Sequence, residues 1–265
     1  MKVLVAIPCY QCEPQIPRVL RQFTPALLER LTEVIVVDNH SGDKTAEVAV
    51  QTLQDLESQL DTSKFRVLRN VENYNLGGSF KIIVEYAWRG GFDFLVLLHG
   101  DDQARVVEIG ELLDRLESNP TLDVIYGARF MKDSKLVNYS KVREWGNRAI
   151  NLMFTLTTLR RVYEIGSGLN LYRVSTLPQE MVHSFPDHLA FDVDLLLNTI
   201  EQKMNIEFHP ITWLEEDQVS NARNVRVGLD VLSILLNWRI GRKRAYKVEP
   251  RHREYRLLYP LSSET

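Results

Sequence analysis

Several features are scarce in this 265-residue sequence, and each scarcity excludes a class of protein. Two cysteines are too few for a disulfide scaffold. Because no run of about 18 apolar residues occurs, we expect no membrane-spanning helix. A net charge of -3, from 32 basic and 35 acidic residues, argues against a general nucleic-acid binder. The remaining composition, 45% hydrophobic and 25% charged, is typical of a globular protein of one large domain, or of one domain with an appendage.

The two cysteines, Cys9 and Cys12, form a C-x-x-C pair. A zinc site would need two further ligands close by, and none is evident in the sequence. A thioredoxin-type pair should open a helix directly, whereas Pro14 and Pro17 follow here. We therefore interpret both thiols as incidental to a loop. The apolar run at the N-terminus is too short for a signal peptide, so we predict a first strand there and a cytoplasmic protein.

Strands and helices are predicted to alternate along the first half of the chain. The apolar patterns predict strands at 2–8, 33–38, 65–70, 93–99 and 123–127, and helices at 17–31, 43–59 and 104–118. The glycine-bearing loop NYNLGGSFK is expected to enter a further helix that reaches about Trp88. Pro25 is expected to kink the first helix. Such alternation predicts a mostly parallel, Rossmann-like α/β sheet flanked by helices. The second half is less regular, with helices expected at 142–160 and 189–203 and strands at 166–172 and 205–212.

One domain boundary is predicted near residue 222, where the character of the sequence changes. Residues 1–222 would form the α/β domain. Residues 223–265 contain an apolar helix that runs through Trp238 into a basic stretch with Arg242, Lys243 and Arg244. Such a helix suits either a membrane surface with anionic lipids or packing on the main domain or on a dimer partner. Both alternatives stay open at this point.

The stretch FLVLLHGDDQ at 94–103 is the centre of the predicted site. Its uninterrupted apolar run is typical of a strand that is buried on both faces. His99, Gly100 and Asp101 follow at the carboxyl end of that strand, where open α/β sheets bind their ligands. Carboxylates at such a place suit a divalent cation that bridges to phosphate oxygens. An ordinary acidic turn is the alternative.

Four separated stretches resemble the motifs of family 2 glycosyltransferases with the GT-A fold, in the dolichyl-phosphate mannose synthase-like branch. They are IPCYQCE at 7–13, VVDNHSGDKT at 36–45, HGDDQ at 99–103 and GSGL at 166–169, with GAR at 127–129 before the last. The resemblance spans roughly the first 220 residues. It implies a GT-A-type single domain with a C-terminal helical tail.

The resemblance implies roles for residues on the donor side. Pro8, Tyr10 and Glu13 would line the nucleotide pocket, and Asp38 would accept hydrogen bonds from the base. A turn or helix-capping acid is the alternative for Asp38. Asn75 and Gly77 stand where the family places a small-residue loop near the donor; a plain turn is the alternative.

The resemblance also implies a metal site with Mn²⁺ or Mg²⁺ at Asp101, the second carboxylate of the family's D-x-D motif. The family usually has an Asp where this chain has His99. An imidazole that reached the metal would favour Mn²⁺, and a packed strand-end histidine is the alternative. Gly100 lies between them on the donor side. Arg129 would neutralise diphosphate charge, with a surface salt bridge as the alternative.

Asp192 is the predicted general base, with Asp194 as the second candidate, because FDVDL at 191–195 resembles the family's E-D-x-D-L segment. If the acceptor is a lipid phosphate, no base is needed and Asp192 becomes a positioning residue. Glu164, Gly166 and Leu169 depart from the branch's pattern. The acceptor therefore stays open between a lipid phosphate and a glycan.

The expected function is a metal-dependent inverting glycosyltransferase with a UDP- or GDP-linked sugar donor. A nicotinamide-dependent oxidoreductase would need G-x-G-x-x-G after the first strand, and this chain has PCYQCEP there. A non-catalytic nucleotide-binding or scaffold protein with a degenerate site is the other alternative. The C-terminal tail is compatible with a peripheral position at the inner face of the membrane. It is equally compatible with formation of a homodimer.

Overall fold

The structure is a computed structural model that describes residues 1–177, 179–188, 191–217, 224–241 and 253–260. Its strands are β1 Val3–Cys9, β2 Glu33–Asp38, β3 Phe65–Asn70, β4 Phe94–Leu98, β5 Val124–Ala128, β6 Lys135–Val137, β7 Leu169–Arg173, β8 Ile206–Pro210, β9 Thr212–Leu214 and β10 Tyr255–Tyr259. Its α-helices are α1 Ile16–Leu20, α2 Pro25–Glu29, α3 Thr45–Leu56, α4 Asn75–Arg89, α5 Glu108–Ser118, α6 Lys141–Thr158, α7 Gln179–His183, α8 Phe191–Glu201 and α9 Asn224–Arg239. Two short 3₁₀ helices occupy Thr62–Lys64 and Val174–Thr176.

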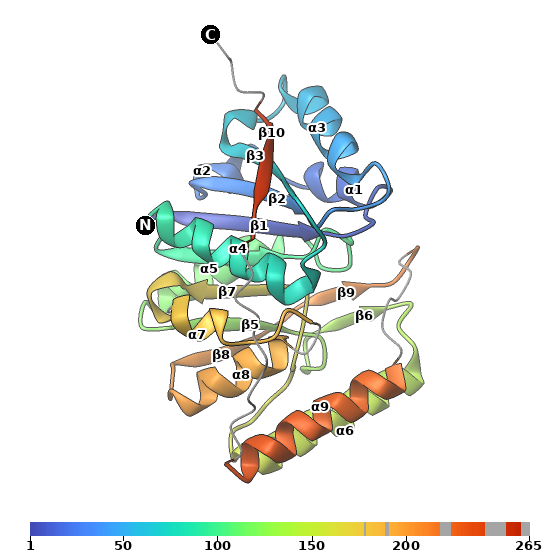
Figure 1. Ribbon diagram of the computed structural model, residues 1–265, viewed down its shortest axis with the longest axis vertical. Helices are drawn as coiled ribbons and strands as arrows, with labels where there is room; N and C mark the ends of the chain where they lie inside the picture. The colour runs from blue at the N-terminus through green and yellow to red at the C-terminus, as the bar shows by residue number, and fades with distance from the viewer. Residues whose placement is uncertain (178, 189–190, 218–223, 242–252, 261–265) are drawn as a thin grey trace.

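An eight-stranded sheet forms the middle of the molecule, in the order β10-β3-β2-β1-β4-β7-β5-β8 (Figure 1). Neighbouring strands from β3 to β4 are parallel, and so are β5 and β8. β7 lies between β4 and β5 and runs antiparallel to both. β6 and β9 form a separate parallel pair. The sheet is mostly parallel, as the sequence predicts.

The sheet has a hydrophobic core on each face because alternate side chains of a strand point to opposite sides. From β1, Val5 and Ile7 enter one core with apolar residues of α1, α3 and α5, while Leu4 and Ala6 enter the other with α4, α8 and α9. All five side chains of β4 are buried, as its apolar run predicts. The molecule is therefore a layered α/β structure with helices on both faces.

The prediction of a single helix at 17–31 is wrong, because the chain forms two short helices there. Pro25 begins α2, where a proline needs no backbone N–H donor. Thr24 caps this helix by accepting a hydrogen bond from the backbone N–H of Leu27 at 3.3 Å. The first helix already ends at Leu20, and the proline starts a second helix instead of kinking a single one.

The C-terminal segment contributes to the main sheet, which the sequence analysis did not anticipate. β10 pairs antiparallel with β3 at the sheet edge, and Tyr259 is buried there. Helix α9 buries Val231, Ile234 and Leu235 in one of the two cores. The predicted tail helix therefore packs on the main domain, which is one of the alternatives given for it. Arg242, Lys243 and Arg244 of the predicted basic stretch lie outside the described residues.

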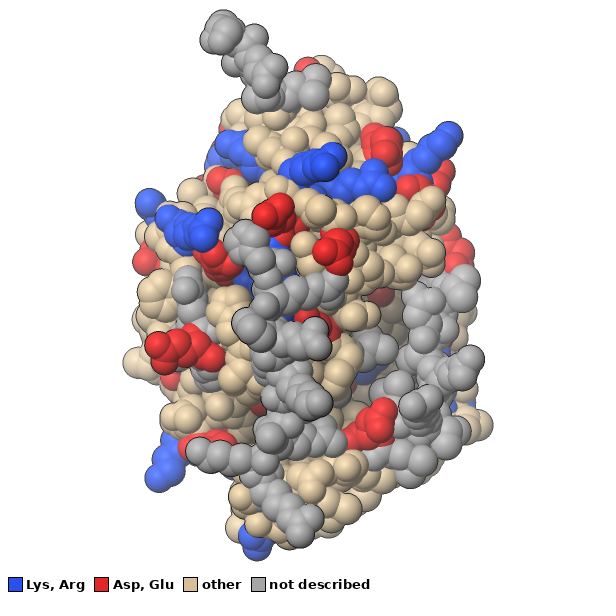
Figure 2. Space-filling model, in the orientation of Figure 1, with Lys and Arg blue, Asp and Glu red and all other residues tan. Residues whose placement is uncertain are grey.

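No helix within the described ranges is long and apolar enough to cross a lipid bilayer. Helices α6 and α9 lie side by side at the end of the molecule opposite β10 (Figure 1). On the face shown in Figure 2, acidic and basic side chains are intermixed over the surface.

Candidate active site

The carboxyl ends of β1, β2 and β4 meet at one edge of the sheet. Cys9 pairs with Asp38 in the register of β1 and β2, and the backbone N–H of Gly100 donates to the carbonyl of Pro8 at 3.0 Å. Gly100 is a site of close approach, since a Cβ there would overlap the Sγ of Cys9. The segment after β4 is thus held tightly against the end of β1.

His99 and Asp101 are brought together at the end of β4. The backbone N–H of His99 donates to Gly168 at 2.7 Å, and a carboxylate oxygen of Asp101 accepts from the backbone of Gln103 at 3.2 Å. Burial raises the pKa of Asp101, and the nearby charge of His99 opposes that rise. The neighbouring Asp102 turns elsewhere, because it accepts from Arg18 at 2.8 Å and from Gln22 at 2.7 Å. Asp102 is therefore engaged by Arg18 and Gln22, and Asp101 stays the predicted metal ligand.

His99 and Asp101 fit a cation that completes its coordination with a ligand. The Nε2 atom of His99 is buried, and no hydrogen-bond partner for it occurs in the described parts of the chain. Across these same parts, no group of three or more His, Cys, Asp or Glu residues is arranged to hold a metal by itself. Mg²⁺ sites of nucleotide-binding enzymes commonly use one or two protein ligands together with substrate phosphates. The donor set of one imidazole and one carboxylate is compatible with such a shared site.

Asp38 is fully buried, with 0% of its surface exposed. One carboxylate oxygen accepts from the backbone N–H of Ser41 at 3.1 Å, and the other lies 3.3 Å from the Nε of Arg69. Burial raises the pKa of Asp38, while the Ser41 hydrogen bond and the Arg69 charge oppose this. The carboxylate sits at the predicted edge of the sheet, and its role towards a base stays a prediction.

The other predicted donor-side residues differ in how far they are exposed to a ligand. Tyr10 is 41% exposed next to half-buried Pro8. Glu13 accepts from the backbone N–H of Lys44 at 2.9 Å, at the start of α3. Asn75 begins α4 with a left-handed φ of 58° and is exposed.

Gly77 makes its close approach to the chain's own backbone. A Cβ at this position would lie 2.5 Å from the carbonyl oxygen of Pro186, and its N–H donates to Asp187 at 2.9 Å. The glycine thus serves the packing of α4 on the segment before α8. Its role towards a donor stays a prediction.

Arg129 forms a buried ion pair, rather than the surface salt bridge that the sequence analysis weighed. Its Nε and Nη2 donate to Glu164 at 2.7 and 2.8 Å, and Nη2 also donates to the carbonyl of Gly166 at 2.9 Å. The side chains of Arg129 and Glu164 are 12% and 2% exposed. Burial lowers the pKa of Arg129, but Glu164 outweighs it and raises the pKa overall. Because Glu164 accepts hydrogen bonds from two nitrogens of its guanidinium, Arg129 is not free to bind a diphosphate through those two nitrogens.

Asp192 lies against the segment that carries Gly166. A Cβ on Gly166 would be 3.4 Å from a carboxylate oxygen of Asp192. Burial raises the pKa of Asp192 from 3.8 to about 6, with His99 lowering it and Glu164 raising it further. Asp192 therefore lies close enough to His99 for the two charges to interact, and its role towards an acceptor stays a prediction.

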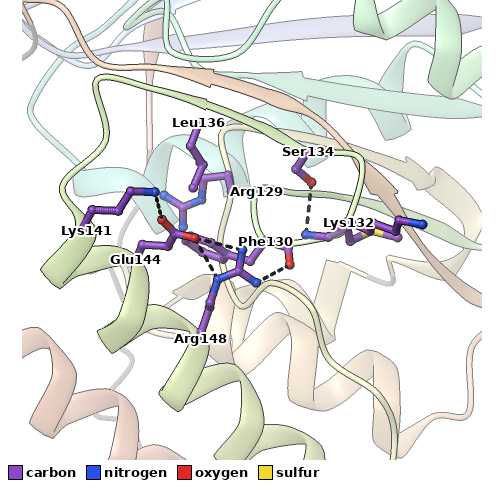
Figure 3. A pocket seen from close by; sticks show the side chains of 9 residues that line it. Arg129, Phe130, Lys132, Ser134, Leu136, Lys141, Glu144 and Arg148 are labelled. Atoms are coloured by element: carbon purple, nitrogen blue, oxygen red, sulfur yellow. Dashed lines mark hydrogen bonds and ion pairs between the residues drawn. The ribbon is translucent and has the colours of Figure 1, made fainter.

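A basic pocket, which none of the sequence motifs predicts, opens next to Arg129. Its volume is about 320 Å³, and its lining residues are Arg129, Phe130, Met131, Lys132, Ser134, Leu136, Lys141, Glu144 and Arg148 (Figure 3). Lys141 and Arg148 extend from α6 and both pair with Glu144 at 3.0 Å. Of the four cationic side chains that line the pocket, Arg129 is paired with Glu164, and Lys141 and Arg148 share Glu144. Four cations against two carboxylates leave an excess of positive charge, which suits an anionic ligand. The density of Lys and Arg between 129 and 148 was the available signal.

Comparisons with known proteins agree on one family. The family described as "Glycosyl transferase family 2" matches residues 4–177. An undecaprenyl-phosphate mannosyltransferase from Micrococcus luteus is 27% identical over 218 residues, which cover 82% of this chain and 85% of the relative. An undecaprenyl-phosphate 4-deoxy-4-formamido-L-arabinose transferase from Pseudomonas aeruginosa is 29% identical over 175 residues, which cover 65% of this chain and 47% of the relative.

Solved structures show the same fold. Glucosyl-3-phosphoglycerate synthase from Mycobacterium tuberculosis, in complex with UDP, superposes with a TM-score of 0.63 and 16% identity, over 91% of this chain and 80% of that chain. A complex of that synthase with Mn²⁺, UDP and glucosyl-3-phosphoglycerate superposes with a TM-score of 0.62. The family match covers most of the described sheet, including the ends of β1, β2 and β4. The chain belongs to glycosyl transferase family 2 and is a glycosyltransferase with the GT-A fold.

Proposed function

We propose that this chain transfers a sugar from a nucleotide-sugar donor to the phosphate of a polyprenyl phosphate, with inversion at the anomeric carbon. The observation that carries the proposal is the basic pocket beside Arg129, which suits a phosphate acceptor. Relatives named as undecaprenyl-phosphate sugar transferases support it. The chain spans 85% of the mannosyltransferase but about half of the formamido-arabinose transferases, so the activity of those longer proteins is not carried over as a whole.

The donor would occupy the edge formed by β1, β2 and β4. Exposed Tyr10 offers a ring for the nucleotide, and Asp38 offers a carboxylate to the N–H donors of the base if the local packing opens. Asp101 and His99 would hold Mn²⁺ or Mg²⁺ together with the diphosphate. When bound, the cation stabilises the negative charge that develops on the departing nucleoside diphosphate. The nucleoside itself is proposed as uridine or guanosine.

The acceptor phosphate would lie in the basic pocket, with Lys132, Lys141 and Arg148 around it. An ionised phosphate oxygen attacks the anomeric carbon from the side opposite the nucleoside diphosphate. The new carbon–oxygen bond forms as the old one breaks, and the electron pair of the broken bond leaves with the diphosphate. Because a phosphate oxygen carries no proton at neutral pH, Asp192 would position the sugar or the acceptor instead of acting as a base.

A direct test compares the wild type with Asp101→Asn on a short-chain isoprenyl phosphate, with UDP- and GDP-linked sugars and with Mn²⁺ or Mg²⁺. We expect kcat/KM to fall by about 100-fold or more, since the metal supplies several kcal/mol of charge stabilisation. Calorimetric titration of Mn²⁺ with nucleoside diphosphate should show weaker binding to the variant. Unchanged turnover would refute the metal assignment, and absence of turnover with any isoprenyl phosphate would refute the proposed acceptor.

We further propose a peripheral position at the inner face of the membrane, where a polyprenyl phosphate presents its headgroup. A lipid acceptor requires the enzyme to work at a bilayer surface, and the basic character of the pocket supports this position.

A further inference from the structure

Helix α6 has an apolar row that faces away from the protein. On its inner side Phe154 is buried and Ile150 packs against one core. The outward row, which we call the outer stripe, consists of Val142, Trp145, Ala149, Leu152, Leu156 and Leu159, the last at the C-cap. These residues recur at intervals of three and four, so they share one side of the helix. The sequence places two apolar faces on one helix, and only one of them is needed for the fold.

The outer stripe is highly exposed along its whole length. Among its large side chains the exposed fraction ranges from 57% at Leu152 to 88% at Leu159, with Trp145 at 73%, and Ala149 is exposed as well. An isolated exposed leucine needs no explanation, but a continuous row of large apolar side chains usually marks an interaction surface. A tryptophan in such a row is typical of helices that lie at a membrane–water interface.

Most of the charged residues around the stripe are cationic. Residues 141–161 contain five cationic side chains and one acidic one, whereas the whole chain has a net charge of -3. The acidic residue, Glu144, is engaged by Lys141 and Arg148. Arg160 and Arg161 follow the helix and are exposed. An apolar helix face with cationic side chains at its border and end complements an anionic lipid surface.

Self-pairing of two copies of α6 fits these charges poorly. The three–four spacing alone would suit a helix pair, whose flanking positions normally carry opposite charges. Here the exposed charged residues that flank the stripe are Lys141, Arg148 and Arg160, all cationic. Two copies would bring like charges together, which is unfavourable.

We propose that the outer stripe of α6 lies in the interfacial region of an anionic lipid bilayer and fixes the enzyme on the membrane. Lys141, Glu144 and Arg148 line the basic pocket from the adjacent side of the same helix. Docking of the stripe therefore brings the mouth of that pocket to the level of the lipid headgroups. This last consequence rests on the proposed acceptor, whereas the membrane contact itself does not.

Co-sedimentation with vesicles tests the contact without donor or acceptor. The full chain is mixed with phosphatidylcholine vesicles that contain about 30 mol% phosphatidylglycerol, and with pure phosphatidylcholine vesicles. We expect the wild type to bind the anionic vesicles preferentially. The triple variant Trp145→Ser/Leu152→Ser/Leu156→Ser should bind at least about 100-fold more weakly, since each large side chain inserted contributes roughly tenfold. Val107→Ser, which removes a side chain 68% exposed on another surface, is the matched control and should bind as the wild type does.

Three further readouts separate the alternatives. Brominated lipids should quench part of the tryptophan fluorescence of the wild type, and Trp145→Phe should lose that part. Arg160→Gln/Arg161→Gln should weaken binding to anionic vesicles only. The triple variant should keep its melting temperature and its turnover of a water-soluble isoprenyl phosphate, while losing turnover of a long-chain polyprenyl phosphate in vesicles.

Equal sedimentation of the wild type and the triple variant would overturn the proposal. A wild-type dimer in vesicle-free sedimentation velocity that the triple variant abolishes would overturn it too, because the stripe would then serve self-association. A wild type that binds vesicles but turns over no isoprenyl phosphate would refute the proposed acceptor and leave the membrane contact supported.

Discussion

Replacing Glu164 by Gln should destabilise the protein strongly, because the change leaves a buried cation without its counterion. Arg129 is 12% exposed, and its guanidinium lies 4.7 Å from the ring centre of Trp213. Removing one partner of a buried ion pair typically costs about 3–5 kcal/mol. A glutamine keeps one acceptor oxygen, and Arg129 keeps its hydrogen bond to Gly166. We therefore expect the lower value, about 3 kcal/mol in the free energy of unfolding.

Equilibrium unfolding in urea, followed by tryptophan fluorescence, measures this loss. For a chain of this size the melting temperature should fall by roughly 6–12 °C. The matched control is Glu215→Gln, which weakens the more exposed pair of Glu215 with Arg143, whose side chains are 20% and 34% exposed. That control should cost no more than about 1 kcal/mol.

A double variant tests the cause. Arg129→Met/Glu164→Leu removes both charges, so it should be clearly more stable than the sum of the two single changes predicts. The reasoning would be refuted if Glu164→Gln cost no more than Glu215→Gln, or if the two single changes at Arg129 and Glu164 were additive. Either result would mean that water reaches the Arg129 guanidinium.

Three other predictions concern the site and the fold. Gly100→Ala should cost about 1–3 kcal/mol by thermal melting, because its Cβ meets Cys9, and Cys9→Ala should relieve part of this. Since the pKa of Asp192 is raised to about 6, ionisation of this one residue should cost the folded state about 3 kcal/mol as the pH rises from 4 to 6. Asp192→Asn should therefore exceed the wild type in stability above pH 6 and match it below pH 4, measured in urea with EDTA; a pH-independent difference would contradict this. Thr24→Ala should cost about 1 kcal/mol, and no loss would mean that its cap is dispensable.

The central strands could be predicted because their residues carry a strong local signal. β1 and β4 are apolar runs that end in polar residues, and the structure buries them as expected. The position of β7 between β4 and β5 could not be predicted in this way, since pairing between segments about 40–75 residues apart leaves no local pattern. β10 was not predicted because its sequence, YRLLY, follows a charged stretch and shows no alternation of apolar and polar residues. In the structure four of its five side chains are at least partly exposed.

Parts of the candidate site could be predicted where a motif residue directly follows a predicted strand, because its position in the sheet is then known. His99 lies near both Asp101 and Asp192, so three residues that the motifs single out lie close together, and their roles stay predictions. The partner of Arg129 could not be predicted, because Glu164 reads only as a departure from the family pattern. The orientation of α6 was equally hidden, since periodicity shows that a helix has an apolar side but not whether that side faces the core.

The pairing of β10 with β3 has a consequence for any shortened form of the protein. Deletion of residues 223–265 would strip the outermost strand from the sheet and leave the backbone donors and acceptors of β3 facing water. Such a bare, apolar rim can recruit strands from other molecules and promote insoluble assemblies. In a vesicle co-sedimentation experiment, a truncated protein would then sediment because it aggregates and not because it binds lipid. Point substitutions in the intact chain avoid this problem.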